Sequence, residues 1–349
     1  MFFRSSPKAA KRRATSRLSV EALDRRDTPS TGVALNGGTL NIVGDNGANS
    51  VQVALIDATN QVRVTADGHS FTFASDQVQA INIDLKGGND DLTVQLGTGG
   101  EPAVTLTRAK AINVNLGDGD DSANFFFGGL GVPGRVIAAD LNVTVHAGAG
   151  NDSVIGNFGE TRAALTFNGF MGTGDDASFV NLWGPIGNGA AVKIGLHGEA
   201  GNDSMGVFAT YVNGYDQVNI GGGGLLDIGL NGGDGNDKLD TTYGGIDRGT
   251  LRVREDGAAG NDKVTAEIHL VRPPFTLFPT GVSDVVLRGG SGFDNLELDV
   301  FGKAHKFRAL IDGGSGFDHA KGTDNVQIVN ANELHLPPFN PPGGGVFLP

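Results

Sequence analysis

Residues 225–241 read LLDIGLNGGDGNDKLDT, which is an alternating apolar strand, a glycine-rich turn, an aspartate and a second alternating strand. Leu226, Ile228 and Leu230 alternate with other residues before the turn, as expected for a half-buried β-strand. Similar segments occur nine times between residues 85 and 321, and every turn ends in Gly-x-Asp. A degenerate copy at 44–53 has Asn49 in the aspartate position. The chain is therefore built largely from one repeated unit.

The spacing of the repeat predicts how the units assemble. Successive motif aspartates lie 24 to 34 residues apart, a period typical of solenoids and arrays. We predict an all-β fold, a parallel β-solenoid of about nine to ten turns over residues 31–335, with 36–55 and 326–335 as caps. The alternative treats each unit as a β-hairpin, which gives antiparallel hairpin repeats or a sandwich. Near-identical turns at a quasi-fixed period favour the solenoid.

Composition excludes several classes of protein. Glycine makes up 57 of 349 residues, but without a triplet period, so the chain is not collagen-like. No apolar run reaches 18 residues, which predicts no transmembrane segment. The chain has no cysteine, so disulfides, thiolate metal sites and cysteine nucleophiles are excluded.

Charge is distributed unevenly along the chain. The net charge is −13, but residues 1–28 carry +5, so the remainder carries −18. An acidic body repels phosphate, and we therefore expect no nucleic-acid partner. Residues 1–30 lack the apolar segment of a secretory signal and are predicted to be a basic, disordered arm. Residues 336–349 form a Pro/Gly-rich tail.

The turns resemble the hemolysin-type, or RTX, calcium-binding repeat, G-G-x-G-x-D-x-(apolar)-x. Residues 232–240 and 289–297 match it completely, and 313–321 match with Ala320 at the apolar position. The other six turns keep Gly-x-Asp but lack one or more earlier glycines. In that family the aspartate side chain and backbone carbonyls of the turn coordinate Ca²⁺ between stacked turns. The resemblance implies calcium ligands at Asp90, Asp121, Asp152, Asp176, Asp203, Asp237, Asp262, Asp294 and Asp318.

The repeat departs from that family in its spacing. Family repeats usually run in tandem every nine residues, whereas here one motif occurs every 24 to 34 residues, which leaves at most one ion-binding edge.

A second resemblance concerns location. Residues 17–30 (RLSVEALDRRDTPS) resemble the N-terminal segment of many large planctomycete surface and exported proteins. This implies a protein of the cell surface or the extracellular space.

The physical chemistry of the turns points to calcium independently. Ca²⁺ takes six to eight oxygen ligands, and stacking brings the aspartates to roughly 5 Å from one another. Facing like charges are destabilising, so a row of nine carboxylates favours bound cations. The neighbouring Asp91, Asp120, Asp175 and Asp234 are candidate additional ligands. The opposing interpretation is that Asn, Asp and Gly are ordinary residues of tight turns, and that the row binds no ion.

These patterns predict a non-enzymatic calcium-binding repeat protein with a structural or adhesive role. Its expected partners are calcium ions and a cell-envelope component or polysaccharide. One alternative is an ion-free structural scaffold. Another is a polysaccharide-active β-helix enzyme, which rests on fold analogy alone and requires a groove of acids, bases and cations. Arg252, Arg254, Glu255 and His269 lie on neighbouring segments and are candidates for a charged patch.

Overall fold

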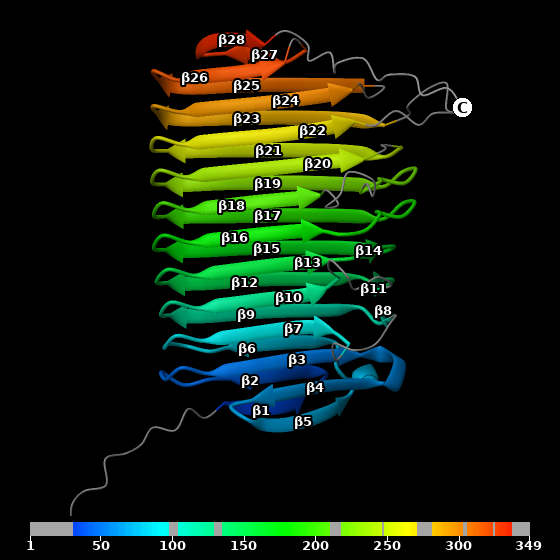
Figure 1. Ribbon diagram of the computed structural model, residues 1–349. Coiled ribbons are helices and arrows are strands. Elements are labelled where there is room, and N and C mark those ends of the chain that lie inside the picture. Colours follow the sequence, from blue (N-terminus) through cyan, green and yellow to red (C-terminus); the bar gives the residue numbers. More distant parts are fainter. Residues whose placement is uncertain are drawn as a thin grey trace, which may run out of the picture.

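The computed structural model describes residues 31–97, 104–128, 135–209, 218–245, 248–270, 281–302, 306–323 and 325–336. Within them the chain is a parallel β-solenoid, which confirms the predicted fold class (Figure 1). The predicted arm, residues 1–30, lies outside the described residues, as do residues 337–349 of the predicted tail. Leu336, assigned to the tail, is the last residue of a strand.

The first of two large sheets contains one long strand from each coil. Its twelve strands, in spatial order, are β1 (Gly32–Asn36), β2 (Thr39–Val43), β6 (Ala80–Asp84), β9 (Lys110–Asp118), β12 (Leu141–Ala149), β15 (Ala164–Thr173), β17 (Ala191–Ala200), β19 (Leu225–Asp234), β21 (Thr250–Ala259), β23 (Val282–Gly292), β25 (Lys306–Gly316) and β27 (Gln327–Val329). All of its pairings are parallel except that of β1 with β2.

The second large sheet contains the strands that leave the glycine-rich turns. Its thirteen strands, in spatial order, are β28 (Asn332–Leu336), β26 (His319–Thr323), β24 (Asn295–Gly302), β22 (Lys263–Leu270), β20 (Lys238–Gly245), β18 (Ser204–Ala209), β16 (Ala177–Leu182), β13 (Ser153–Phe158), β10 (Ser122–Phe127), β7 (Asp91–Leu96), β3 (Ser50–Ile56), β4 (Gln61–Ala66) and β5 (His69–Ala74). A small third sheet pairs β8 (Val104–Leu106), β11 (Arg135–Ile137) and β14 (Glu160–Thr161).

The core lies between the two large sheets and is built from rows of stacked side chains. Ile228 on β19, for example, pairs in register with Ile194 on β17 and Val253 on β21, and all three are at most 3% exposed. A single coil has no partner for this apolar face. Because the coils stack in parallel and in register, each row is covered by the row of the facing sheet and by its own neighbours.

The N-terminal end of the solenoid is closed by antiparallel pairs. β1 pairs with β2, and β3, β4 and β5 form an antiparallel meander (Figure 1). Two 3₁₀ turns, η1 (Asp57–Thr59) and η2 (Ser75–Gln77), flank β4 and β5. The antiparallel alternative is therefore wrong for the repeats, and antiparallel pairing occurs at this end, where it covers the last parallel strands β2 and β3.

The glycine of Gly-x-Asp is required by the stacking of the turns. Gly260 has a φ of 147°, and a Cβ on it would lie 1.4 Å from the carbonyl oxygen of Gly235 in the preceding turn. No side chain fits at that distance, so only glycine permits the turns to stack this closely. This steric constraint is sufficient to explain why glycine recurs at this position, without any bound ligand.

Candidate functional site: an aspartate ladder inside the turns

The nine motif aspartates lie in one row at the edge of the solenoid where the turns connect the two large sheets. Each stands at the entry to a strand of the second sheet, and its side chain shares the inward face of that strand. All nine are only 2–3% exposed. The structure therefore brings together every aspartate that the sequence predicts as a ligand, and it places them inside the fold.

Hydrogen bonds join these aspartates into what we call the inner ladder. In each step, the backbone N–H of one ladder residue donates to Oδ1 of the aspartate in the next turn, at 2.7–3.1 Å. The chain of donors runs from Asn49 to Asp294, and the last acceptor is Asp318. A backbone N–H therefore lies between successive carboxylates. This partly offsets the repulsion expected for facing like charges.

A second ladder runs along the exposed side of the same turns, in the opposite direction. Here the residue between Gly and Asp accepts, through Oδ1, the backbone N–H of its counterpart in the next turn, at 2.8–3.2 Å. This outer ladder begins at Asn89 and its last donor is Phe293. Phe293 and Phe317 have no side-chain oxygen, and their rings stack at 5.9 Å. The ladder ends there because the acceptor is missing.

Asn49 caps the N-terminal end of the inner ladder. Its Oδ1 accepts the N–H of Asp45, and its Nδ2 lies 3.5 Å from Oδ2 of Asp67. Asp67 in turn accepts the N–H of Ser50. A carboxamide suits this position because it can face another carboxylate as a donor, which an aspartate cannot do.

The second oxygen of every ladder aspartate has no hydrogen-bond partner among the described residues. Oδ2 is buried and unpaired in all nine. Burial raises the pKa of the eight carboxyls from Asp90 to Asp294, and the N–H bond to Oδ1 opposes part of the rise. The pKa reaches about 6 at Asp90, Asp203 and Asp262 and about 7 at Asp152. An unsatisfied buried polar atom is uncommon, and nine in one row indicate a common cause.

The position five residues before each aspartate divides the inner ladder into two regions. In the five C-terminal turns this position is glycine, namely Gly198, Gly232, Gly257, Gly289 and Gly313. In the four N-terminal turns it carries a buried apolar side chain, namely Leu85, Leu116, Ala147 and Met171.

Glycine at this position lets two oxygens approach the same point. A Cβ on Gly232 would lie 2.3 Å from Oδ2 of Asp237 and 2.6 Å from the carbonyl oxygen of Gly257. Gly257 shows the same arrangement with Asp262, at 2.4 Å, and the carbonyl of Gly289, at 2.6 Å. The C-terminal turns thus combine a free carboxylate oxygen with a carbonyl oxygen of the next turn.

The orphaned oxygens fit a hard cation such as Ca²⁺, which prefers carboxylate and carbonyl oxygen. The fit has a limit. In the described part of the chain, no group of three or more His, Cys, Asp or Glu side chains is arranged to hold a metal ion. A cation at a turn would therefore have to take most of its ligands from backbone carbonyls and water. Asp203, Asp237, Asp262, Asp294 and Asp318 are the residues that would hold it.

The neighbouring acids proposed as extra ligands lie on the other side of the turn. Asp91, Asp120, Asp175 and Asp234 are all exposed, whereas the ladder aspartates point inward. Asp120 and Asp175 accept backbone N–H groups in the outer ladder. These four residues do not extend the inner ladder.

The residues proposed as one charged patch are distributed over three surfaces. Arg254 lies on the outer face of β21 and forms ion pairs with Asp227 (3.1 Å) and Asp284 (3.8 Å). His269 lies on the second sheet and contacts Glu267 at 2.6 Å. Glu255 points into the core and is 1% exposed. The four candidate residues therefore do not form one patch, because strict alternation along β21 places Arg254 and Glu255 on opposite faces.

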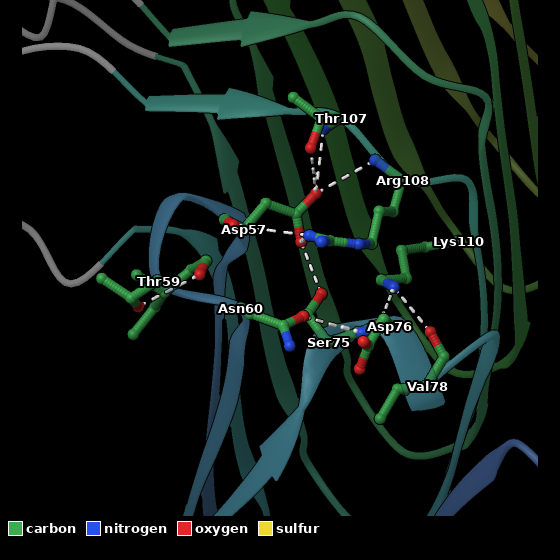
Figure 2. Close-up of polar contacts among 10 residues, drawn as sticks. Asp57, Thr59, Asn60, Ser75, Asp76, Val78, Thr107, Arg108 and Lys110 are labelled. Atoms are coloured by element: carbon green, nitrogen blue, oxygen red, sulfur yellow. Dashed lines mark hydrogen bonds and ion pairs between the residues drawn. The ribbon is translucent and has the colours of Figure 1, made fainter.

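A buried polar cluster that sequence reasoning missed anchors the N-terminal cap (Figure 2). Asp57 accepts the Ser75 hydroxyl at 2.5 Å and the N–H groups of Thr107 and Arg108 at 2.9 and 3.0 Å. Burial alone would raise the pKa of Asp57, but these donors and the Lys110 charge outweigh it and lower the pKa. Lys110 donates to the carbonyls of Ser75 and Val78. The cluster is internally satisfied, which is typical of a structural anchor.

A shallow depression of about 460 Å³ lies beside this cluster on the outer face of the first sheet. Gln79, Asp140, Asn142 and Thr166 supply its polar groups. Lys110 also lines it, but the ammonium of Lys110 is committed to two carbonyls of the cap. This depression lacks the converging acid, base and cation that the enzyme alternative requires.

Comparison with known proteins adds no assignment. Protein-family models, curated proteins and solved structures were all searched, and none of them matches this chain. In the described residues, no helix is long and apolar enough to cross a membrane.

Proposed function

We propose that this protein is a non-enzymatic, calcium-binding repeat protein in which Ca²⁺ held at the inner ladder stabilises the solenoid. The observation that carries the proposal is the row of nine buried Oδ2 atoms without a hydrogen-bond partner. A buried carboxylate oxygen costs free energy unless it is hydrogen-bonded, protonated or bound to a cation. A cation bound at a turn would satisfy such an oxygen. We expect binding chiefly in the five C-terminal turns.

The proposed location is the cell surface or the extracellular space, where the role is structural or adhesive. A ligand that binds only the folded chain stabilises the fold in proportion to its concentration. Calcium is scarce in the cytosol and abundant outside, so the chain would gain its stability after export. A cell-envelope component or polysaccharide is the partner class we propose for such a scaffold.

A second candidate is an ion-free structural scaffold, and a specific observation favours it. Every Oδ1 of the inner ladder already accepts a backbone N–H, and Gly260 shows that stacking alone demands the motif glycine. In this case Asp152, with a pKa of about 7, is partly protonated near neutral pH, and Asp90, Asp203 and Asp262, with pKa values of about 6, are protonated to a smaller extent. The two candidates differ only in what satisfies Oδ2.

Calcium titration into the purified, chelator-treated chain separates the candidates. We expect several equivalents of Ca²⁺ to bind by calorimetry and to raise the melting temperature, with Mg²⁺ giving a smaller effect because it demands octahedral geometry. The triple variant Asp237→Asn, Asp294→Asn, Asp318→Asn should bind fewer ions. Asparagine keeps an Oδ1 that can accept the ladder N–H, and it removes the charge.

The matched control is Asp234→Asn, which removes one carboxylate from the exposed side of the Asp237 turn. We expect its calcium stoichiometry to equal that of the wild type. No heat of binding and an unchanged melting temperature would exclude the calcium proposal and leave the ion-free scaffold. Loss of binding in Asp234→Asn alone would move the site to the outer face of the turns.

A further inference from the structure

Glu255 is a carboxylic acid inside the apolar core. It lies on β21, where its register partners are Leu230 on β19 and Leu287 on β23. Leu230, Glu255 and Leu287 are 2%, 1% and 0% exposed. In this row of the core the glutamate takes the place of a leucine, and the sheets pack on both sides of it.

No group in the described structure compensates its charge. Both carboxylate oxygens lack a hydrogen-bond partner, as does the Oγ1 of Thr241 on β20. Burial raises the pKa of Glu255 to about 8, Thr241 lowers it slightly through a contact that falls short of a full hydrogen bond, and Asp240 raises it further. At neutral pH the side chain is therefore mostly a neutral acid.

The elements around Glu255 supply no counter-charge. β19 and β23 present Leu230 and Leu287 in its row, and the inward residues of β22 are apolar. On β20, Tyr243 also points inward, but its hydroxyl donates to the carbonyl of Val218. The cations nearest in sequence, Arg252 and Arg254, lie on the outer face of β21 and pair with Asp227. None of these strands therefore supplies a cation to Glu255, and the one charge that acts on it, that of Asp240 on β20, is negative.

We propose that Glu255 makes β20, β21 and the strands paired with them a proton-sensitive seam in the solenoid, closed when the acid is neutral and locally opened when it ionises. This inference is independent of calcium. A lone carboxylate is strongly disfavoured in an apolar interior, and local opening hydrates it without unfolding the rest of a repeat protein, whose coils contact mainly their neighbours. Opening at β21 also breaks the ladder bond between Asp237 and Asp262.

The sign of the pH dependence follows from the two states. In the open state Glu255 titrates near its ordinary value of 4.5, and in the closed state near 8. The contribution of Glu255 to the stability of the closed state is complete below pH 4.5 and is lost as the pH rises to 8. In this range Glu255 ionises in the open state but stays protonated in the closed state, so a rising pH favours opening. The opening constant should therefore rise roughly tenfold per pH unit across this window and level off above it.

Hydrogen exchange of the full chain in chelator, from pH 5 to pH 9 and corrected for intrinsic rates, tests the seam. In wild type we expect the opening constant of β20–β22 amides to rise steeply between pH 6 and pH 8. Glu255→Gln cannot ionise, so the wild-type to variant ratio should grow roughly tenfold per pH unit. The ratio cancels the contribution of the ladder aspartates, which both proteins share.

Two further variants complete the test. Glu255→Leu restores the leucine row and should fold, even if the glutamine variant does not, and the wild-type to Glu255→Leu ratio of opening constants should also grow roughly tenfold per pH unit. Glu267→Gln removes an exposed glutamate from β22 and should follow the wild-type profile. The same pH dependence in wild type and in Glu255→Leu would overturn the proposal, whatever the outcome of the calcium titration.

Discussion

The N-terminal four turns and the C-terminal five turns of the inner ladder share one hydrogen-bonding scheme but differ in what faces the aspartate. Both regions have the Oδ1 to N–H bond and an unpaired Oδ2. In the N-terminal region a buried apolar residue such as Ala147 stands five positions before the aspartate, whereas in the C-terminal region glycine does.

The difference separates two roles of the motif. The Gly-x-Asp motif by itself allows the turns to stack, since it is present in both regions and its contacts are made between protein groups without a ligand. The earlier glycine brings in a carbonyl oxygen of the next turn, and only the C-terminal region has it. The resemblance to calcium-binding repeats is therefore concentrated where the oxygens converge.

The largest expected effect is a pH dependence that differs between the regions. In chelator, the raised pKa values of Asp90, Asp152, Asp203 and Asp262 mean that the stabilising contribution of these carboxyls is complete below pH 3.8 and is lost as the pH rises to about 6–7. Hydrogen exchange should show β6–β16 and β17–β26 both losing protection over this range. Apart from the Glu255 contribution in β20–β22, saturating calcium should remove the dependence in β17–β26 only, because a bound cation favours the ionised carboxylate. Equal rescue of both regions would show that the earlier glycine has no role in binding.

A reciprocal pair of substitutions should interconvert the two kinds of turn. Gly257→Ala places a Cβ 2.4 Å from Oδ2 of Asp262, so we expect about 2 kcal/mol of destabilisation and a smaller calcium response. Ala147→Gly removes the side chain near Asp152 and should cost about 1 kcal/mol in chelator. Urea unfolding with and without calcium measures both. A calcium response equal to that of the wild type in both variants would contradict the comparison.

The smallest expected effect lies at the C-terminal end of the inner ladder. Ala331 occupies the register position above Asp318, since β26 pairs His319 with Asn332, and alanine offers no oxygen to the Asp318 N–H. Ala331→Asn should supply an acceptor and raise the stability by about 1 kcal/mol. Ala331→Val, which adds bulk without an oxygen, is the control for thermal unfolding. Equal shifts in both variants would attribute the gain to packing.

Local pattern was sufficient to predict the fold and the row of aspartates. Period-two alternation specifies which face of a strand is buried, and the repeat length specifies one coil, so Leu226, Ile228 and Leu230 could be placed in the core directly. The same alternation places Glu255 on the inward face with Leu251 and Val253. The alternation by itself therefore predicts that Glu255 is buried, whereas the charge of Glu255 by itself predicts that it is exposed.

Other features had no local signal. Asp57 and Thr107 are 50 residues apart, and their contact depends on how the N-terminal cap folds against the first regular coils. The capping role of Asn49 likewise depends on Asp67, which reaches it through the antiparallel β3–β4 pair. Neither pair lies at a repeat spacing, so periodicity carries no information about them.

By itself the sequence determined the parallel coil, the buried faces and the alignment of nine aspartates, because each of these follows from a pattern repeated along the chain. Only the tertiary structure decided that the two ladders run in opposite directions, that one oxygen of each aspartate is used and the other is not, and that glycine brings a carbonyl close to the free oxygen in five turns. These properties arise between coils. Their physical basis is the alignment of backbone groups that are 24 to 34 residues apart in sequence and adjacent only after stacking.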